Sequence, residues 1–163
     1  MRVFLCSFAG FSVAIPASAV SSLMLYTNKA AQTVEYNPQN NNTFVALPLL
    51  FRRPLASIRH GIILKNGHDE ECNDTVENKI ILLTTEVECE TEIQPEEIYP
   101  LPKAFNVFRF SALFSGILFD SHLRKKRAVS DAQGRDNPVL LLNPEQLVQN
   151  IKTKPPVTGS CIA

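Results

Sequence analysis

The N-terminal segment constrains the chain most, because it decides how much of the sequence belongs to the folded protein. It carries one basic residue, Arg2, then an apolar run over residues 3–15, and then small residues at Ala17 and Ala19. A basic start, an apolar middle and an A-x-A ending are typical of a secretory signal peptide. The run is also shorter than the roughly 20 apolar residues of a membrane-spanning helix. We therefore predict a signal peptide over residues 1–19, cleaved after Ala19. The alternative is a buried N-terminal strand or helix.

Composition limits the protein to a modest range of classes. Residues 20–163 are enough for one domain. Hydrophobic residues make up 45% of the chain and charged residues 20%, which is ordinary for a globular protein with a real core. The formal net charge is +0, so the chain as a whole gives no electrostatic reason to expect nucleic acid as a partner. With the signal peptide, these values predict a secreted, extracellular protein.

Three cysteines follow the predicted signal peptide: Cys72, Cys89 and Cys161. Cys72 and Cys89 are the natural disulfide pair, and closing a loop of this length stabilises a chain by about 3 kcal/mol. Cys161 is then a free or intermolecular thiol, able to link two chains as a dimer. Pairing of Cys161 with Cys72 or Cys89 stays open, as do three reduced thiols.

Two short motifs agree with secretion. Asn41 and Asn73 each begin an Asn-x-Thr acceptor for N-glycosylation, and each lies in a polar stretch typical of an exposed loop. Both asparagines are therefore predicted to carry glycans.

The clearest secondary structure is a strand over residues 79–93, where side chains alternate with a period of two. One face carries apolar residues and Cys89, and the other carries Glu86, Glu88, Glu90 and Glu92. We interpret this acidic row as a solvated strand face, with a basic partner as the alternative. Calcium is a weaker alternative, because a straight row of carboxylates does not converge on one point.

Other segments give weaker signals. A small apolar cluster in a polar stretch consists of Leu23, Met24, Leu25 and Tyr26. Residues 110–118 have apolar residues at helical spacing, with a strand also open. Asn143 followed by Pro144 predicts a short helix that begins there and ends near Ile151. The fold expected is a small β-rich or α+β domain with a disordered or loosely packed C-terminal tail.

The strongest functional motif is the basic cluster Arg124-Lys125-Lys126-Arg127. In an exposed segment of a secreted chain, four basic residues resemble a proprotein-convertase site cleaved after Arg127. The alternatives are a patch that binds heparan sulfate or another polyanion, a solvated charge run, and a nuclear address. The predicted organisation is a signal peptide (1–19), a glycosylated β-rich domain (20–123), a basic linker (124–137) and a C-terminal segment with a short helix (138–163).

Together these features predict a secreted glycoprotein precursor that acts by binding, through its body or its C-terminal peptide, to an unknown protein receptor or surface polyanion. The alternative is an uncleaved secreted protein that binds polyanions. No nucleophile-elbow, zincin or phosphate-loop motif is present in the sequence. We therefore expect no catalytic residues, no cofactor and no metal ligands, while a small hydrolase with an unrecognised site stays open.

Overall fold

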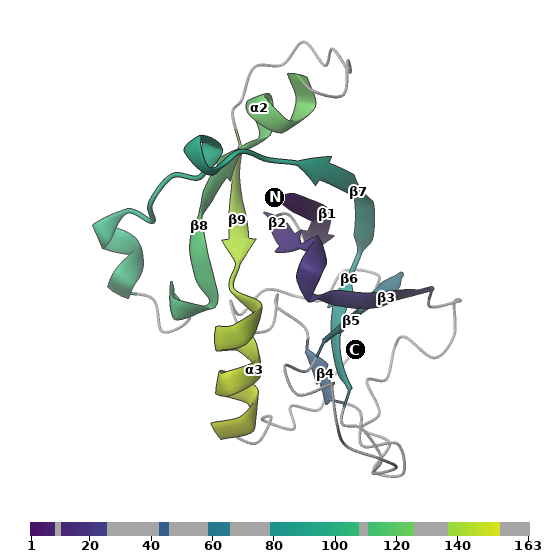
Figure 1. Ribbon diagram of the computed structural model, residues 1–163. Helices are drawn as coiled ribbons and strands as arrows, with labels where there is room; N and C mark the ends of the chain where they lie inside the picture. The colour runs from purple at the N-terminus through teal and green to yellow at the C-terminus, as the bar shows by residue number, and fades with distance from the viewer. Residues whose placement is uncertain are drawn as a thin grey trace.

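The computed structural model describes residues 1–8, 11–25, 43–45, 59–65, 79–107, 111–125 and 137–153. These residues form two β-sheets with short helices at their margins (Figure 1). The prediction of a small β-rich domain is confirmed. Three 3-10 turns, η3 (Pro95–Glu97), η4 (Lys103–Val107) and η5 (Ser111–Leu113), lie between the strands of the second half.

The first sheet, sheet A, has five strands in the order β7-β1-β2-β9-β8. The strands β1 (Arg2–Phe8) and β2 (Phe11–Pro16) form an antiparallel pair at its centre. On one side, β7 (Glu86–Glu92) pairs antiparallel with β1, and on the other β9 (Pro138–Leu142) pairs parallel with β2. The strand β8 (Phe114–Phe119) completes the sheet beside β9. Sheet A therefore needs the first and the last described parts of the chain together.

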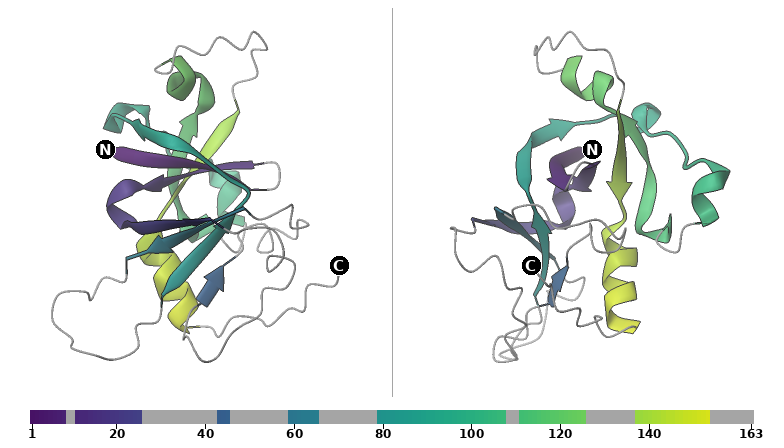
Figure 2. Two further views of the ribbon diagram at one scale, coloured as in Figure 1. Left: turned by 90° about the vertical axis from the view of Figure 1, so that its right-hand side faces the viewer. Right: turned by 180° about the vertical axis from the view of Figure 1, so that it is seen from behind.

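The second sheet, sheet B, has four strands in the order β3-β5-β6-β4. The strands β3 (Val20–Leu25), β5 (His60–Leu64) and β6 (Ile80–Thr84) are antiparallel neighbours, while β4 (Thr43–Val45) pairs parallel with β6. Every residue of β6 is buried, as expected for an inner strand covered on both faces. β3 and β4 are the edges of this sheet (Figure 2).

Among the described elements, the chain passes between the two sheets at two places. The turn η1 (Ala17–Ala19) leads from β2 in sheet A to β3 in sheet B. The second crossing is at Thr84 and Thr85, so the single strand predicted over residues 79–93 is two strands in different sheets. The buried hydroxyl of Thr84 can donate to the carbonyl oxygen of Ser7 at 2.7 Å or of Glu86 at 2.9 Å. Satisfying this hydroxyl at the bend fixes the point where the strand changes sheet.

The predicted signal peptide is wrong, because residues 1–19 form the centre of sheet A. Val3, Leu5 and Ala14 are buried on one face of the sheet, and Cys6 and Val13 on the other. A strand that is buried on both faces has a continuous run of apolar residues. The middle region of a signal peptide has the same composition, so the two cannot be told apart by this feature. The alternative of a buried N-terminal strand is correct, and it takes the form of two strands and a turn.

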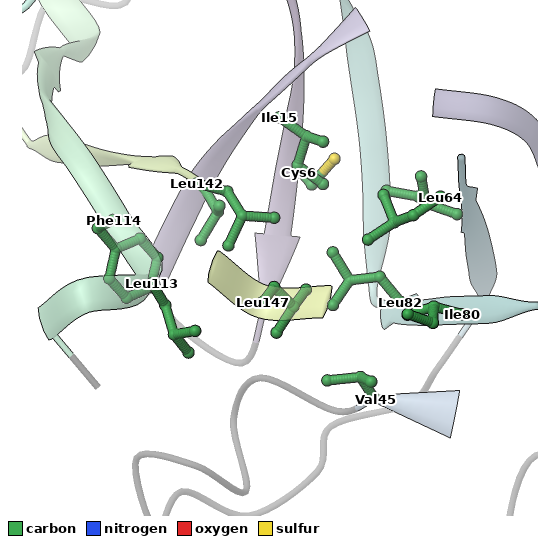
Figure 3. Close-up of a cluster of buried hydrophobic side chains, with 12 residues drawn as sticks. Cys6, Ile15, Val45, Leu64, Ile80, Leu82, Leu113, Phe114, Leu142 and Leu147 are labelled. Atoms are coloured by element: carbon green, nitrogen blue, oxygen red, sulfur yellow. The ribbon is translucent and has the colours of Figure 1, made fainter. Parts of the chain in front are cut away.

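The main hydrophobic core lies between the two sheets (Figure 3). Sheet A contributes Ile15 and Leu142, sheet B contributes Leu82, and Leu147 comes from the helix α3 (Pro144–Thr153). Figure 3 shows Leu147 between the side chains of the two sheets. The helix therefore fills the space that two twisted sheets leave between them.

A second core covers the other face of sheet A. The helix α2 (Asp120–Lys125) inserts Leu123 there, and Ile93 and Ile98 pack with it against Leu118 of β8. Sheet A is consequently covered on both of its faces.

The predicted start of the C-terminal helix is confirmed. The side-chain Oδ1 of Asn143 accepts a hydrogen bond from the backbone N–H of Gln146 at 3.3 Å, and the backbone N–H of Leu147 donates to the carbonyl oxygen of Asn143 at 3.1 Å. Pro144 occupies the first helical position, where the missing N–H costs nothing. The cap therefore sets where α3 begins and brings Leu147 into the core.

Residues 114–119 form the strand β8, so the helical spacing of this segment is misleading. Gly116 explains the difference: a Cβ atom there would lie 2.6 Å from Cγ2 of Ile98 and 2.9 Å from the carbonyl oxygen of Tyr99. The missing side chain lets residues 98–99 approach β8, and Tyr99 and Ile117 exchange backbone hydrogen bonds of 2.9 Å. Pairing along both edges of β8 outweighs the local spacing.

We expect Gly116→Ala to destabilise the protein by about 1–3 kcal/mol, because the added methyl group overlaps a side chain and a carbonyl that cannot both move. Urea unfolding measures the change, with Ser115→Ala on the same strand as the control: it removes an exposed hydroxyl with a 3.4 Å hydrogen bond to the carbonyl oxygen of Leu141 and should cost less than about 1 kcal/mol. Equal stability of the two variants would show that residues 98–99 do not pack closely on β8.

Candidate functional site: the exposed edge strand β3

The most exposed apolar surface in the described residues lies on β3. The exposed fractions of its side chains are 76% for Leu25, 47% for Leu23 and 39% for Met24. The strand is an edge of sheet B and has β5 as its neighbour there, with Leu23 opposite Ile62 and Leu25 opposite His60. Figure 1 shows β3 at the right of the molecule, away from β8 and α2. Three adjacent apolar side chains on an edge strand are a feature of interaction surfaces.

Both faces of β3 are open beyond its first residue. Residues 21–25 are all exposed, and successive side chains of a strand point to opposite faces. Leu23 and Leu25 therefore share one face, and Met24 lies on the other. The strand carries no charged residue and no proline, which are two of the devices that keep edge strands from pairing with other chains. Its one irregularity is a shift of register with β5 between Val20 and Ser22, before the apolar side chains begin. The sequence signal for this site is the cluster Leu23-Met24-Leu25, whose exposure the sequence does not reveal.

Basic residues lie at the ends of the strands inside this edge. Arg59 precedes β5 at the Leu25 end of β3, and Lys65 follows β5 at the other end, where its backbone N–H donates to the carbonyl oxygen of Ala19 at 2.9 Å. Lys79 precedes β6 at that same end, since Ile80 pairs with Leu64. All three side chains are exposed. The four strands of sheet B contain no aspartate or glutamate, so the described part of this sheet is positively charged.

The acidic row has a different place, on the edge strand β7 of sheet A. Its four glutamates are exposed, as the alternation predicts. Arg2 on the neighbouring strand lies 3.2 Å from the carboxylate of Glu90, and the hydroxyl of Ser7 donates to Glu88 at 3.3 Å. Residues of the neighbouring strand thus compensate part of this negative charge. The ion pair of Arg2 with Glu90 is exposed and adds little to stability.

Cys6 is a buried thiol in the core between the sheets. Burial, with a smaller contribution from the Glu88 carboxylate, raises the pKa of this thiol from 9.0 to about 12. A thiol in this state is protonated at neutral pH and is a poor nucleophile or metal ligand. Cys6 is therefore a core residue.

We expect the Cys6 thiol to react with iodoacetamide at least about 100-fold more slowly in the folded protein than in urea at pH 8. A variant with serine at the other three cysteines makes this rate measurable. Equal reaction rates in the folded protein and in urea would contradict the burial of Cys6.

The same thiol makes stability depend on pH. Because the folded pKa is above the unfolded value, the thiol's contribution to stability is full below pH 9 and is lost as the pH rises through about 12.

Both predicted processing sites overlap elements of the fold. Ala17 and Ala19 form the turn η1 between the sheets. Arg124 and Lys125 belong to the helix α2, while Lys126 and Arg127 lie outside the described residues. Cleavage after Arg127 would separate β9 and α3 from the rest of the chain, although β9 lies inside sheet A between β2 and β8. A released C-terminal peptide is incompatible with this topology.

Several predicted residues fall outside the described part of the chain. Asn41, Asn73, Cys72 and Cys161 lie there, so their predicted modifications are untested. Cys89 lies in β7, where its side chain is not described. These residues were linked to an oxidising compartment by the signal peptide, and that link no longer holds.

The described residues offer no other clear chemical centre. They contain no group of three or more histidine, cysteine, aspartate or glutamate side chains placed to bind a metal ion. Within the same ranges, no helix has the length and apolar character needed to cross a membrane.

The fold is similar to that of the scaffolding protein TtCheW from Thermoanaerobacter tengcongensis. The match has a TM-score of 0.52 and a sequence identity of 15%, and it covers 87% of this chain and 88% of that chain. No family model matches the sequence, and no curated protein matches it either. At this identity the likeness establishes the fold. It includes most of the chain in one architecture.

This finding corrects the functional prediction. A secreted glycoprotein precursor requires residues 1–19 to leave the protein, whereas the fold uses them as its central strands. The extracellular location, the convertase as processing enzyme and the receptor or polyanion as partner all depended on that step and are wrong, and the uncleaved secreted alternative fails with them. The Cys161-linked dimer loses the oxidising compartment from which it was inferred, and Cys161 itself lies outside the described residues.

Proposed function

We propose that this chain is a protein-binding module of the scaffold type, which acts through the edge strand β3 and not by catalysis. The observation that carries the proposal is the exposure of Leu23, Met24 and Leu25 side by side on that edge. Burying apolar surface is favourable by about 25 cal/mol per Å². An exposed apolar surface of this kind therefore favours binding to a protein partner that covers it.

A further observation supports this function. The chain shares its architecture with a protein described as a scaffold, over most of the length of both. A fold alone does not determine function, so the exposed strand carries the argument and the likeness adds to it.

Photo-crosslinking in the cells that produce the chain tests this proposal. A photoreactive phenylalanine at position 25 should give a discrete crosslinked product with another protein, and the same group at exposed Glu145 on α3 should not. Adding Leu23→Glu to the position-25 variant should remove the product, because the new charge lies on the same face of the strand. Equal crosslinking from positions 25 and 145, or none from either, would refute a binding function for β3.

A further inference from the structure

We propose that β3 binds its partner by strand addition, and that the partner segment is extended, apolar in its middle and acidic at its ends. This inference rests on the proposed function and adds the chemistry of the partner. It follows from the backbone of β3, its side chains and the charges around it.

The backbone of β3 requires an extended partner. In an edge strand, alternate residues direct their N–H and C=O groups away from the sheet, where they remain open to another strand. Within the described residues, β5 is the neighbour of β3 in the sheet. A helix satisfies its own backbone groups and would leave these open, whereas an added strand pairs with them along the length of β3.

The side chains of β3 set the character of the partner's middle. Leu23 and Leu25 lie on one face and Met24 on the other, all exposed. A strand added alongside places its own side chains next to these on both faces. Apolar residues on both faces of the partner bury this surface, whereas charged residues there would be desolvated without a counter-charge.

The cations near β3 favour negative charge at the two ends of the partner segment. Arg59 and Lys65 lie at the two ends of β5, the strand beside β3, and Lys79 lies one strand farther in, before β6. None of the three forms an ion pair within the described part of the chain. Carboxylates at both ends of an added segment would therefore meet positive charge. Two copies of this chain paired antiparallel through β3 would instead bring Arg59 of one toward Lys65 of the other, so a second copy is disfavoured.

Selection from a random peptide library displayed on phage, with the full-length chain immobilised, tests the inference. The enriched peptides should have four to six alternating apolar or β-branched residues flanked by aspartate or glutamate. Their affinity, measured by fluorescence anisotropy, should fall at least about 10-fold for the double variant Leu23→Ala and Leu25→Ala. It should fall about 3-fold or more for Arg59→Gln with Lys65→Gln, with a weaker dependence on salt.

The backbone contribution has its own measurement. N-methylation can be placed on either of the two alternating sets of residues in a selected peptide. Methylation of one set should abolish binding, and methylation of the other set should leave it nearly intact, because only every second N–H pairs with β3. The variant Ser115→Ala, on the exposed side of β8, is the matched protein control and should bind normally. Peptides that are basic at their ends, or that bind regardless of N-methylation, would overturn the inference.

The outcomes separate this inference from the proposed function. A crosslinked partner at position 25, together with selected peptides that are helical or basic, leaves the binding function standing and overturns strand addition. Sedimentation of a dimer that Leu25→Glu dissociates would also overturn it, because a second copy would then occupy β3. Failure of both crosslinking and selection would refute the two proposals together.

Discussion

A chain that begins at residue 20 will not fold. It lacks β1 and β2, which are the central strands of sheet A and hold β7 on one side and β9 on the other. Both hydrophobic cores would also lose buried side chains, namely those of Val3, Leu5, Cys6, Val13 and Ile15. The loss is comparable with the whole stability of a domain, about 5–15 kcal/mol. We expect circular dichroism and proton NMR of this chain to show no cooperative unfolding and no dispersed amide signals.

A pair of point variants tests the same claim in the full-length protein. Val13→Asp places a carboxylate in the core between the sheets and should cost at least about 3 kcal/mol. Ser18→Asp introduces the same residue at an exposed position of η1 and should change stability by less than about 0.5 kcal/mol. A cooperative unfolding transition of residues 20–163 alone, equal to that of the full chain, would contradict the central place of β1 and β2.

The sequence predicts those elements whose signals are local. The helix α3 has a cap at Asn143 and a proline at its first position, and both act within one turn. The row of glutamates on β7 shows its solvent face through simple alternation. For these segments the interactions that decide the structure lie within a few residues of one another.

The sequence fails where the deciding contacts are remote. Residues 3–15 are apolar because sheet A is covered on both faces, and the covering residues, such as Leu123 and Leu147, are more than a hundred positions away. The strand predicted over residues 79–93 divides at Thr84 because the carbonyl of Ser7 accepts a hydrogen bond there. The candidate site was missed for the same reason. The cluster Leu23-Met24-Leu25 has the composition of a core strand, and only the packing of the other strands shows that it lies outside the core.

Leu147→Ala will destabilise the protein by about 2–5 kcal/mol. Leu147 is 2% exposed and contacts the core to which both sheets contribute, so removing its side chain leaves a cavity between elements that cannot close independently. Urea unfolding of the full-length variant measures the loss. The same substitution at Leu25, which is 76% exposed, should cost less than about 0.5 kcal/mol.

The comparison of these two leucines also separates stability from binding. Leu25→Ala should keep the unfolding transition and weaken the crosslinked complex, whereas Leu147→Ala should lower the transition and leave the surface of β3 unchanged at temperatures where the variant is folded. A Leu25→Ala variant as unstable as Leu147→Ala would mean that β3 packs into the core in solution. Its apolar side chains would then need no partner, and the binding function assigned to this edge would be wrong.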